Sequence, residues 1–176
     1  MDRAWGGLRA QLARRRVTLG FVAAVAVLIL ARPTWASWTV GLVVACAGEA
    51  IRVWAAGHIE KGSEVTTSGP YRWMKHPLYV GSSVMAVGVI VAARSPVLAL
   101  LTTIYMAATI TAAITSEEAH LRQKFGAAYD RYSRAEGLTA RRSFSLERAM
   151  RNREYRSATG VLAGFLILAL KVAFPL

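Results

Sequence analysis

The sequence has very little cysteine, little proline and few acidic side chains. Among its 176 residues only Cys46 is a cysteine, and only five residues are prolines. A single cysteine excludes an internal disulfide and a metal cluster built from thiolates. Cys46 lies inside an apolar run, which favours the role of a small apolar side chain. We therefore expect neither disulfide chemistry nor a bound metal.

Acidic residues are outnumbered by basic ones. The chain has 10 Asp and Glu against 22 Lys and Arg, a net charge of +12. Such an excess occurs in nucleic-acid-binding proteins. Here, however, basic blocks alternate with apolar runs, 55% of the residues are hydrophobic, and the mean hydropathy is +0.36. This alternation is typical of membrane proteins with charged loops. We expect the membrane, and no nucleic acid, as a partner.

The apolar runs predict an all-α integral membrane protein with about five transmembrane helices. A span needs roughly 20 mostly apolar residues. It must be helical, because lipid offers no hydrogen-bond partners to open backbone. The expected spans are 17–31, 37–56, 77–93, 96–114 and 158–174. The whole chain, 1–176, is expected to be a single domain, with the fifth span as a C-terminal addition.

Loop charges predict the orientation. Most of the lysines and arginines fall before the first span, after the second and after the fourth, whereas the opposite loops hold Arg32 and Arg94. By the positive-inside rule the N-terminus is cytosolic and the C-terminus lies outside. The membrane is either a bacterial inner membrane or the endoplasmic reticulum.

The third and fourth spans form a predicted helical hairpin. Only Arg94 and Ser95 separate them, and such a short connection makes neighbouring helices antiparallel. Ser95 can cap the next helix, and Pro96 suits its first position. Neither glycine nor proline occurs between Val97 and Phe125. We therefore expect one helix to continue out of the membrane as far as Phe125.

Segment 68–81 carries the first group of chemically interesting residues. Pro77 suits the first position of a helix that follows His76. The N–H groups of Leu78 and Tyr79 would then be free, and a helix start of this kind can bind an anion such as a cofactor carboxylate. An interfacial anchor is the alternative interpretation. It would use the aromatic and basic side chains Tyr71, Arg72, Trp73, Lys75 and Tyr79.

Segment 117–132 carries the second group. Glu117 and Glu118 are adjacent carboxylates where a span leaves the bilayer, a place where acids repel each other. They form either ion pairs with Arg122 or a site for a cation or ribose hydroxyls. Within the second span, Glu49 and Arg52 share one helix face. They are either functional residues or a structural ion pair near the interface.

Together, the two segments resemble the isoprenylcysteine carboxyl methyltransferase family and the related phospholipid N-methyltransferases. The resemblance covers about residues 48–132. It rests on 69–72, 75–81, Glu117, Glu118, Leu121, Phe125, Gly126, Tyr129 and Tyr132. It implies a small helical bundle that binds S-adenosyl-L-methionine at its cytosolic face and methylates a lipid or prenylated small molecule.

The resemblance also implies roles for individual residues. The implied cofactor-binding residues are His76, Pro77, Leu78, Tyr79, Gly81, Glu117, Glu118, Phe125, Tyr129 and Tyr132. Glu118 is also expected to be catalytic, and Arg131, Arg134 or Arg52 could hold a carboxylate acceptor. Three departures leave the acceptor open among a carboxylate, an amine and a thiol. Lys75 replaces the usual arginine, the short arginine-bearing stretch after Tyr132 lacks the usual proline, and the chain continues into a fifth span.

Two other functions fit the same sequence. Some NADPH-dependent membrane reductases are similar around both segments, although they are usually longer. A non-catalytic membrane module would explain the spans and basic loops, but neither the paired carboxylates nor the His-Pro helix start. Cofactor choice separates these alternatives. Gly160 and Gly164 are spaced for close helix contact, but they leave the oligomeric state unassigned.

Overall fold

A computed structural model describes residues 25, 29–136 and 142–174 of the chain. Within these residues the protein is helical and contains no strand, which confirms the predicted all-α class. Three of the described helices are long and apolar enough to cross a membrane, and a fourth apolar helix is shorter. The first expected span, 17–31, lies mostly outside the described residues. The chain is an integral membrane protein.

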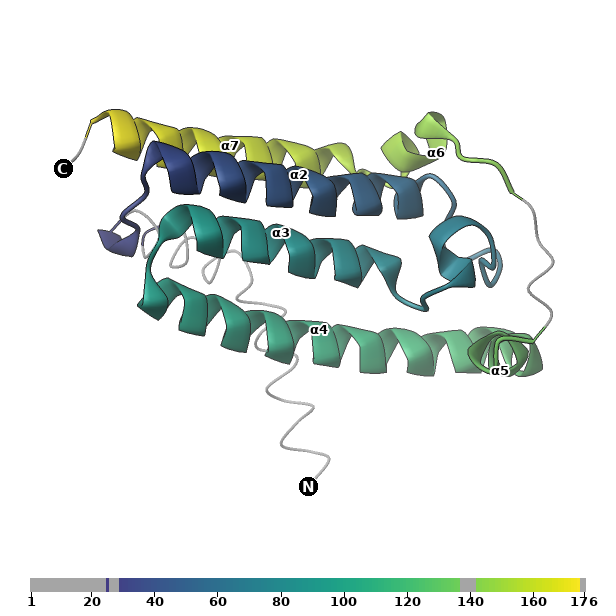
Figure 1. Cartoon of the computed structure of the whole chain (residues 1–176). Helices are drawn as coiled ribbons and strands as arrows, with labels where there is room; N and C mark the ends of the chain where they lie inside the picture. The colour runs from purple at the N-terminus through teal and green to yellow at the C-terminus, as the bar shows by residue number, and fades with distance from the viewer. Residues whose placement is uncertain (1–24, 26–28, 137–141, 175–176) are drawn as a thin grey trace, which may run out of the picture.

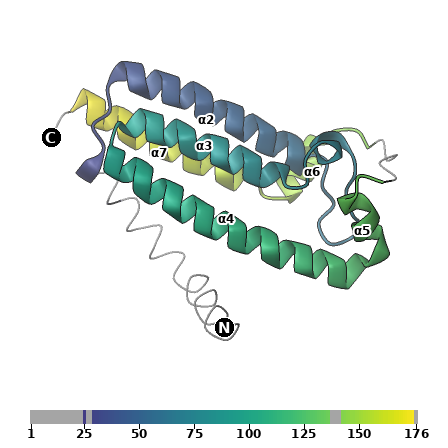
Figure 2. The same cartoon turned by 60° about the horizontal axis from the view of Figure 1, so that its bottom comes forward.

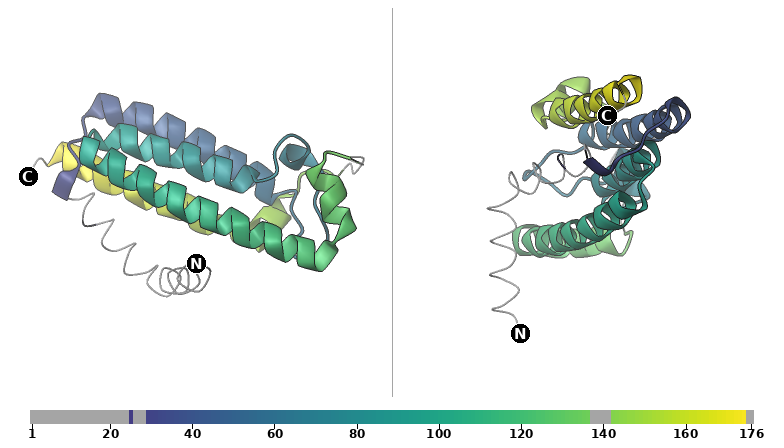
Figure 3. Two further views of the ribbon diagram at one scale, coloured as in Figure 1. Left: turned by 90° about the horizontal axis from the view of Figure 1, so that it is seen from below. Right: turned by 90° about the vertical axis from the view of Figure 1, so that its left-hand side faces the viewer.

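The long helices lie lengthwise beside one another, and the short elements gather at one end of the bundle (Figures 1 and 3). The long helices are α2 (Trp35–Ala56), α3 (Pro77–Ala93), α4 (Pro96–Phe125) and α7 (Tyr155–Ala173). The short elements are the 3₁₀-helix η1 (Gly69–Arg72), α5 (Ala127–Ser133) and α6 (Leu146–Arg151). This end, which carries both predicted motif segments, is called the motif end below.

Helices α2 and α3 pack closely because small residues line their contact. A Cβ placed on Gly88 would lie 2.6 Å from both the Ala45 nitrogen and the Gly41 oxygen. A Cβ on Gly81 would lie 2.5 Å from Cγ of Arg52. Small residues at such positions let the backbones of membrane helices approach each other. The pair forms the rigid centre of the bundle.

The expected α3–α4 hairpin is confirmed. Arg94 adopts the left-handed conformation, with φ of 49°, and Ser95 accepts a hydrogen bond from the Leu98 nitrogen at 3.4 Å. Helix α4 then runs without a break for 30 residues. It diverges from α3 toward the motif end (Figure 2), and Leu98, near the hairpin, is its one buried residue. The divergence leaves room between the helices at the motif end.

Helix boundaries differ from the expected spans where polar residues extend a helix. Helix α2 begins at Trp35 because Thr34 and Ser37 form a capping box, in which the Thr34 side chain accepts from the Ser37 nitrogen at 3.2 Å. Helix α7 begins at Tyr155, before its apolar run. Hydropathy marks the part of a helix in lipid and not its first residue.

Helix α7 docks onto α2 through polar contacts at both ends. Near one end, Nε1 of Trp38 donates to the Phe165 carbonyl at 2.8 Å. At the motif end, the Arg52 Nε lies 2.6 Å from a carboxylate oxygen of Glu154. Helix α7 thus confirms the expected fifth span and adds it to the α2–α3 pair.

Candidate active site

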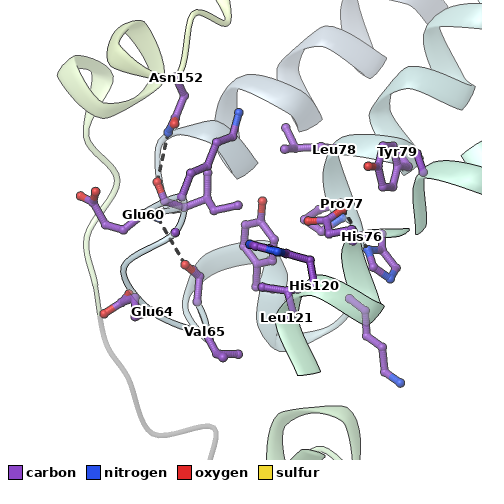
Figure 4. A pocket seen from close by; sticks show the side chains of 18 of the residues that line it. Glu60, Glu64, Val65, His76, Pro77, Leu78, Tyr79, His120, Leu121 and Asn152 are labelled. Carbon is purple, nitrogen blue, oxygen red and sulfur yellow. Dashed lines mark hydrogen bonds and ion pairs between the residues drawn. The ribbon is translucent and has the colours of Figure 1, made fainter. Parts of the chain in front are cut away.

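A cavity of about 980 Å³ opens at the motif end. Its walls come from the loop after α2, the start of α3, the outer part of α4, helix α5 and the junction of α6 with α7. Figure 4 shows the loop residues Glu60 and Glu64 on one side of the cavity and His76 and Tyr79 on the other. The divergence of α4 from α3 therefore creates a chamber between the two predicted segments.

His76 and the paired carboxylates meet at this cavity, although they lie 42 residues apart in sequence. Nε2 of His76 is 3.2 Å from an oxygen of Glu118, and Nδ1 is 3.9 Å from an oxygen of Glu117. His76 is the N-cap residue of α3, directly before Pro77. The proline fixes where the helix begins, and this places the imidazole against α4.

The two carboxylates have different surroundings. The second oxygen of Glu118 is 3.3 Å from the Arg122 guanidinium, one turn further along α4. Glu118 is not among the residues that line the cavity, whereas Glu117 is. The ion-pair interpretation therefore holds for Glu118. Glu117 is the carboxylate available to a ligand.

The backbone at the start of α3 differs from expectation. The Tyr79 nitrogen donates to the His76 carbonyl at 3.0 Å, so it is not free to bind an anion. The prediction of two free N–H groups was wrong for Tyr79. The tight first turn satisfies this donor internally, and Tyr79 contributes its ring, 5.8 Å from the His76 imidazole.

Three tyrosines form the part of the cavity wall nearest α5. The Tyr132 hydroxyl donates to the Tyr71 carbonyl at 3.0 Å and so ties α5 to η1. The Tyr71 side chain is buried, and its own hydroxyl has no hydrogen-bond partner within the described part of the chain. Burial raises the pKa of Tyr71, Tyr129 and Tyr132, so all three hydroxyls stay protonated at neutral pH. Tyr71 thus offers a donor to a bound molecule.

The structure brings most of the predicted site residues together. The predicted residues that line the cavity are His76, Pro77, Leu78, Tyr79, Glu117, Phe125, Tyr129 and Tyr132. Gly81 does not line the cavity. It is buried against α2, where the absence of a side chain lets the two helices pack closely.

Arg131 and Arg134 also lie away from the cavity. Both are exposed; Arg131 lies on α5, and Arg134, directly after the end of this helix, pairs with Glu136 at 3.0 Å. Because the short helix turns Tyr129 and Tyr132 inward, Arg131 falls on another of its faces. The structure does not bring them to the position expected for holding an acceptor.

Sequence reasoning missed two stretches of the cavity wall, in the loop after α2 and at the start of α7. They contribute Ile59, Glu60, Lys61, Gly62, Glu64, Val65, Thr66, Asn152, Arg153, Glu154, Arg156 and Ser157. The sequence signal that could have indicated this loop is its acidic residues, because the chain has few of them. Glu60 lies 2.7 Å from Arg148, whose hydrogen bond holds the pKa of Glu60 below its usual value. Arg52, for which the sequence left a functional role and an ion pair with Glu49 open, lines the cavity and also lies 4.0 Å from Glu49.

Comparisons with known proteins agree with the resemblance seen in the sequence. A family model described as phospholipid methyltransferase matches residues 21–128. Two proteins named probable protein-S-isoprenylcysteine O-methyltransferase, from Oryza sativa subsp. indica and subsp. japonica, are each 35% identical over 111 residues. These matches cover 56% of this chain and 58% of each relative.

A bacterial protein is similar to the same degree. The nickel-cobalt-cadmium resistance protein NccN of Alcaligenes xylosoxydans xylosoxydans is 35% identical over 106 residues, 57% of this chain and 49% of the relative. The chain thus spans about half the length of these curated relatives. No solved structure matches it.

Proposed function

From the premise that this chain belongs to the phospholipid methyltransferase family, we propose that it transfers a methyl group from S-adenosylmethionine to a lipid or lipid-like acceptor. The observation that carries the proposal is the meeting of His76 with Glu117 and Glu118 beside a cavity at the end of membrane-spanning helices. By the distribution of loop charges, the motif end faces the cytosol.

The residues of the cavity fit S-adenosylmethionine. Its volume of about 980 Å³ suits a nucleoside-sized molecule together with part of an acceptor. Glu117 can bind the positively charged sulfonium or amino group. Lys75 lines the cavity with no carboxylate within ion-pair distance in the described chain, so it can bind the carboxylate. The Tyr71 hydroxyl supplies a buried donor that is otherwise unused.

When bound, S-adenosylmethionine supplies an electrophilic methyl group, so the protein needs no nucleophile of its own. Its task is to hold donor and acceptor in line, which can account for several kcal/mol of the barrier. We assign Glu117 and His76 to contact with the donor. Glu118 is a positioning residue, since it links His76 to Arg122 and restricts the imidazole. Phe125 and Tyr129 close the chamber toward water.

The acceptor enters from the membrane. The cavity reaches Leu78 on α3, Ala113 on α4 and Ser157 on α7, all on apolar helices. An alkyl or prenyl chain can therefore lie along these helices while its headgroup reaches the cavity.

Methyl transfer itself tests this proposal. Purified protein in detergent is incubated with S-adenosylmethionine carrying a labelled methyl group and with lipid extracts. We expect the label in the organic phase, on an amphiphile that mass spectrometry identifies. Binding of a reduced nicotinamide cofactor, with no label transferred to any lipid, would contradict the proposal.

A further inference from the structure

The C-terminal segment 142–157 lies outside the residues matched by the family, 21–128, yet it builds one wall of the cavity. In Figure 1, α6 sits at the motif end, above the loop that follows α2. In Figure 4, Asn152 lies on the side of the cavity away from His76 and Tyr79. The chamber thus has a wall that the matched family region does not provide.

This wall is held firmly to the end of α2. The Arg148 guanidinium donates to a Glu60 oxygen at 2.7 Å and to the Gly57 carbonyl at 2.5 Å. The Asn152 amide donates to the carbonyls of Ala56 at 2.9 Å and Ile59 at 3.0 Å. Because three of these four bonds reach backbone carbonyls, the position of the wall is set mainly by the backbone at and just after the end of α2.

The arginines of this segment divide into two groups. Arg142, Arg148 and Arg151 each pair with a carboxylate, at 2.7, 2.7 and 3.1 Å. Arg153 and Arg156 line the cavity, and no carboxylate of the described residues lies within 4.0 Å of either. Their positive charge is left for a ligand.

The backbone of Arg153 supports a functional role. Its φ is 62°, the left-handed conformation that normally favours glycine. The bonds from the Arg153 nitrogen to the Met150 carbonyl and from the Glu154 nitrogen to the Ala149 carbonyl close the end of α6 in a Schellman-type motif. Arginine costs more than glycine at this position. Unlike Arg94, which has the same conformation at the end of α3, Arg153 lines the cavity.

The position of the two arginines relative to the membrane indicates that they can reach a lipid headgroup. Arg156 lies in the first turn of the membrane-spanning helix α7, and Arg153 precedes Glu154, the N-cap residue of that helix. Charged side chains at the end of a span reach the headgroup region. Guanidinium groups bind carboxylate and phosphate oxygens in pairs of parallel hydrogen bonds.

We propose that Arg153 and Arg156 bind an anionic group, a phosphate or a carboxylate, on the lipid acceptor. They do so from the wall built by the C-terminal segment, whereas the proposed methyl donor lies at His76 and Glu117. The inference rests on the proposed function and names the chemistry of the acceptor. It also explains why Arg131 and Arg134, which lie away from the cavity, are not needed for this task.

Binding of three amphiphiles to the full-length protein tests the proposal. The protein is held in a neutral detergent and saturated with S-adenosylhomocysteine, and binding is followed by calorimetry. The probes are a short-chain phosphatidylethanolamine, an S-prenylated N-acetylcysteine, and the uncharged methyl ester of the latter. We expect at least one of the two charged probes to bind roughly tenfold or more tightly than the ester. The tighter one identifies phosphate or carboxylate as the recognised group.

Variants assign this preference to the two arginines. In R153Q/R156Q the preference for the charged probe over the ester should disappear, while the Kd for S-adenosylmethionine changes by less than about twofold. R153K/R156K should keep part of this preference, because the charge remains but the two-pronged guanidinium is lost. R153G should weaken binding of the charged probe while raising the unfolding temperature, because glycine accepts the left-handed backbone. R72Q, which removes an exposed charge outside the cavity, should bind as the wild type does.

Four results would overturn the proposal. They are equal binding of charged and uncharged probes, a preference that survives in R153Q/R156Q or is lost equally in R72Q, and a loss of S-adenosylmethionine affinity in R153Q/R156Q. Failure of the wild type to bind S-adenosylmethionine would instead contradict the proposed function, so the two failures are distinguishable.

Discussion

His76 depends on its neighbours for its position. Pro77 begins α3, the imidazole stands just before that helix, and Glu118 lies 3.2 Å from Nε2. Arg122 in turn holds Glu118. The chain His76–Glu118–Arg122 therefore sets the ring orientation from a single face of α4.

Removing either end of the His76–Glu118 contact should impair catalysis. We expect His76→Ala and Glu118→Gln each to lower the rate of methyl transfer roughly tenfold or more, because a misplaced donor loses its alignment with the acceptor. Initial rates with labelled methyl donor measure this, and elution as a single species in detergent controls for folding. Near-normal turnover by both variants would contradict the assignment of the site.

Glu117 should behave differently from Glu118. Because Glu117 faces the cavity, Glu117→Gln should weaken S-adenosylmethionine binding roughly tenfold or more, since a lost hydrogen bond to a charged group costs about 1.5–3 kcal/mol. Glu118→Gln should weaken this binding less, because it acts through His76. Calorimetry compares the two Kd values. A larger loss of affinity in Glu118→Gln than in Glu117→Gln would mean that Glu118 contacts the donor and Glu117 does not.

Glu60 makes the stability of the cavity wall depend on pH. The hydrogen bond from Arg148 lowers the pKa of Glu60 in the folded protein. This contact therefore contributes stability at pH values above the pKa of Glu60 in the unfolded chain, which is about 4.3. That contribution is lost as the pH falls through the folded pKa. We expect the difference in Tm between wild type and Glu60→Gln to be positive at pH 7 and to shrink below about pH 5. A difference that stays constant with pH would contradict this role.

At the residue scale, the sequence predicts those side chains whose position follows from a local signal. The His-Pro pair and the adjacent carboxylates are of this kind, and they lie where expected. Gly81, Arg131 and Arg134 were expected at the cavity only through the resemblance. Which face of a helix they occupy depends on packing with α2 and on the inward turn of two tyrosines, and neither can be read from spacing along the chain.

At the element scale, close packing of α2 and α3 leaves no room for an added side chain at the glycines of their contact. Gly88→Ala should destabilise the fold by about 1–3 kcal/mol, because its Cβ would meet the backbone of α2 at 2.6 Å. Gly160→Ala on α7 is the matched control. Nothing lies within 4 Å of its Cβ position, so it should be neutral or slightly stabilising. Unfolding in mixed micelles measures both, and equal effects would contradict the packing.

The Arg52–Glu154 pair should matter most when only one partner is removed. Glu154→Leu leaves the largely buried Arg52 with only the more distant Glu49 carboxylate, at 4.0 Å, and should cost about 1–3 kcal/mol, allowing for partial exposure. The double variant Arg52→Met/Glu154→Leu should recover at least part of this loss, because the guanidinium is then removed together with its main partner, while Glu49 keeps its hydrogen bond from Ser157. The same unfolding assay measures both variants. A double variant less stable than Glu154→Leu would contradict this view of the contact.

Elements were predictable where hydropathy and helix signals coincide. Helix α3 and the unbroken α4 follow from proline positions, from Ser95 and from the absence of glycine between Val97 and Phe125. The loop after α2 and the α6–α7 junction were not predictable as one wall. Their contact joins Glu60 to Arg148 across 88 residues, and only the folded chain brings them together.

At the scale of the whole molecule, the bundle separates two tasks. Its centre is the tightly packed α2–α3 pair, on which α7 docks, and it fixes the motif end. Helix α4 leans away from α3 (Figure 2). The chamber that opens there is lined by His76 and Glu117 and also by Arg153 and Arg156 of the C-terminal segment. In the proposed function, these two groups serve the methyl donor and the membrane-borne acceptor.

Binding of S-adenosylmethionine to the purified protein tests the central claim most directly. Calorimetry in detergent should give a micromolar Kd for the wild type, a markedly weaker one for Glu117→Gln, and no binding of reduced nicotinamide dinucleotide phosphate. Binding of the nicotinamide in place of S-adenosylmethionine would contradict the account. So would binding of S-adenosylmethionine that is equally tight in wild type and Glu117→Gln, because the cavity would then not be its site.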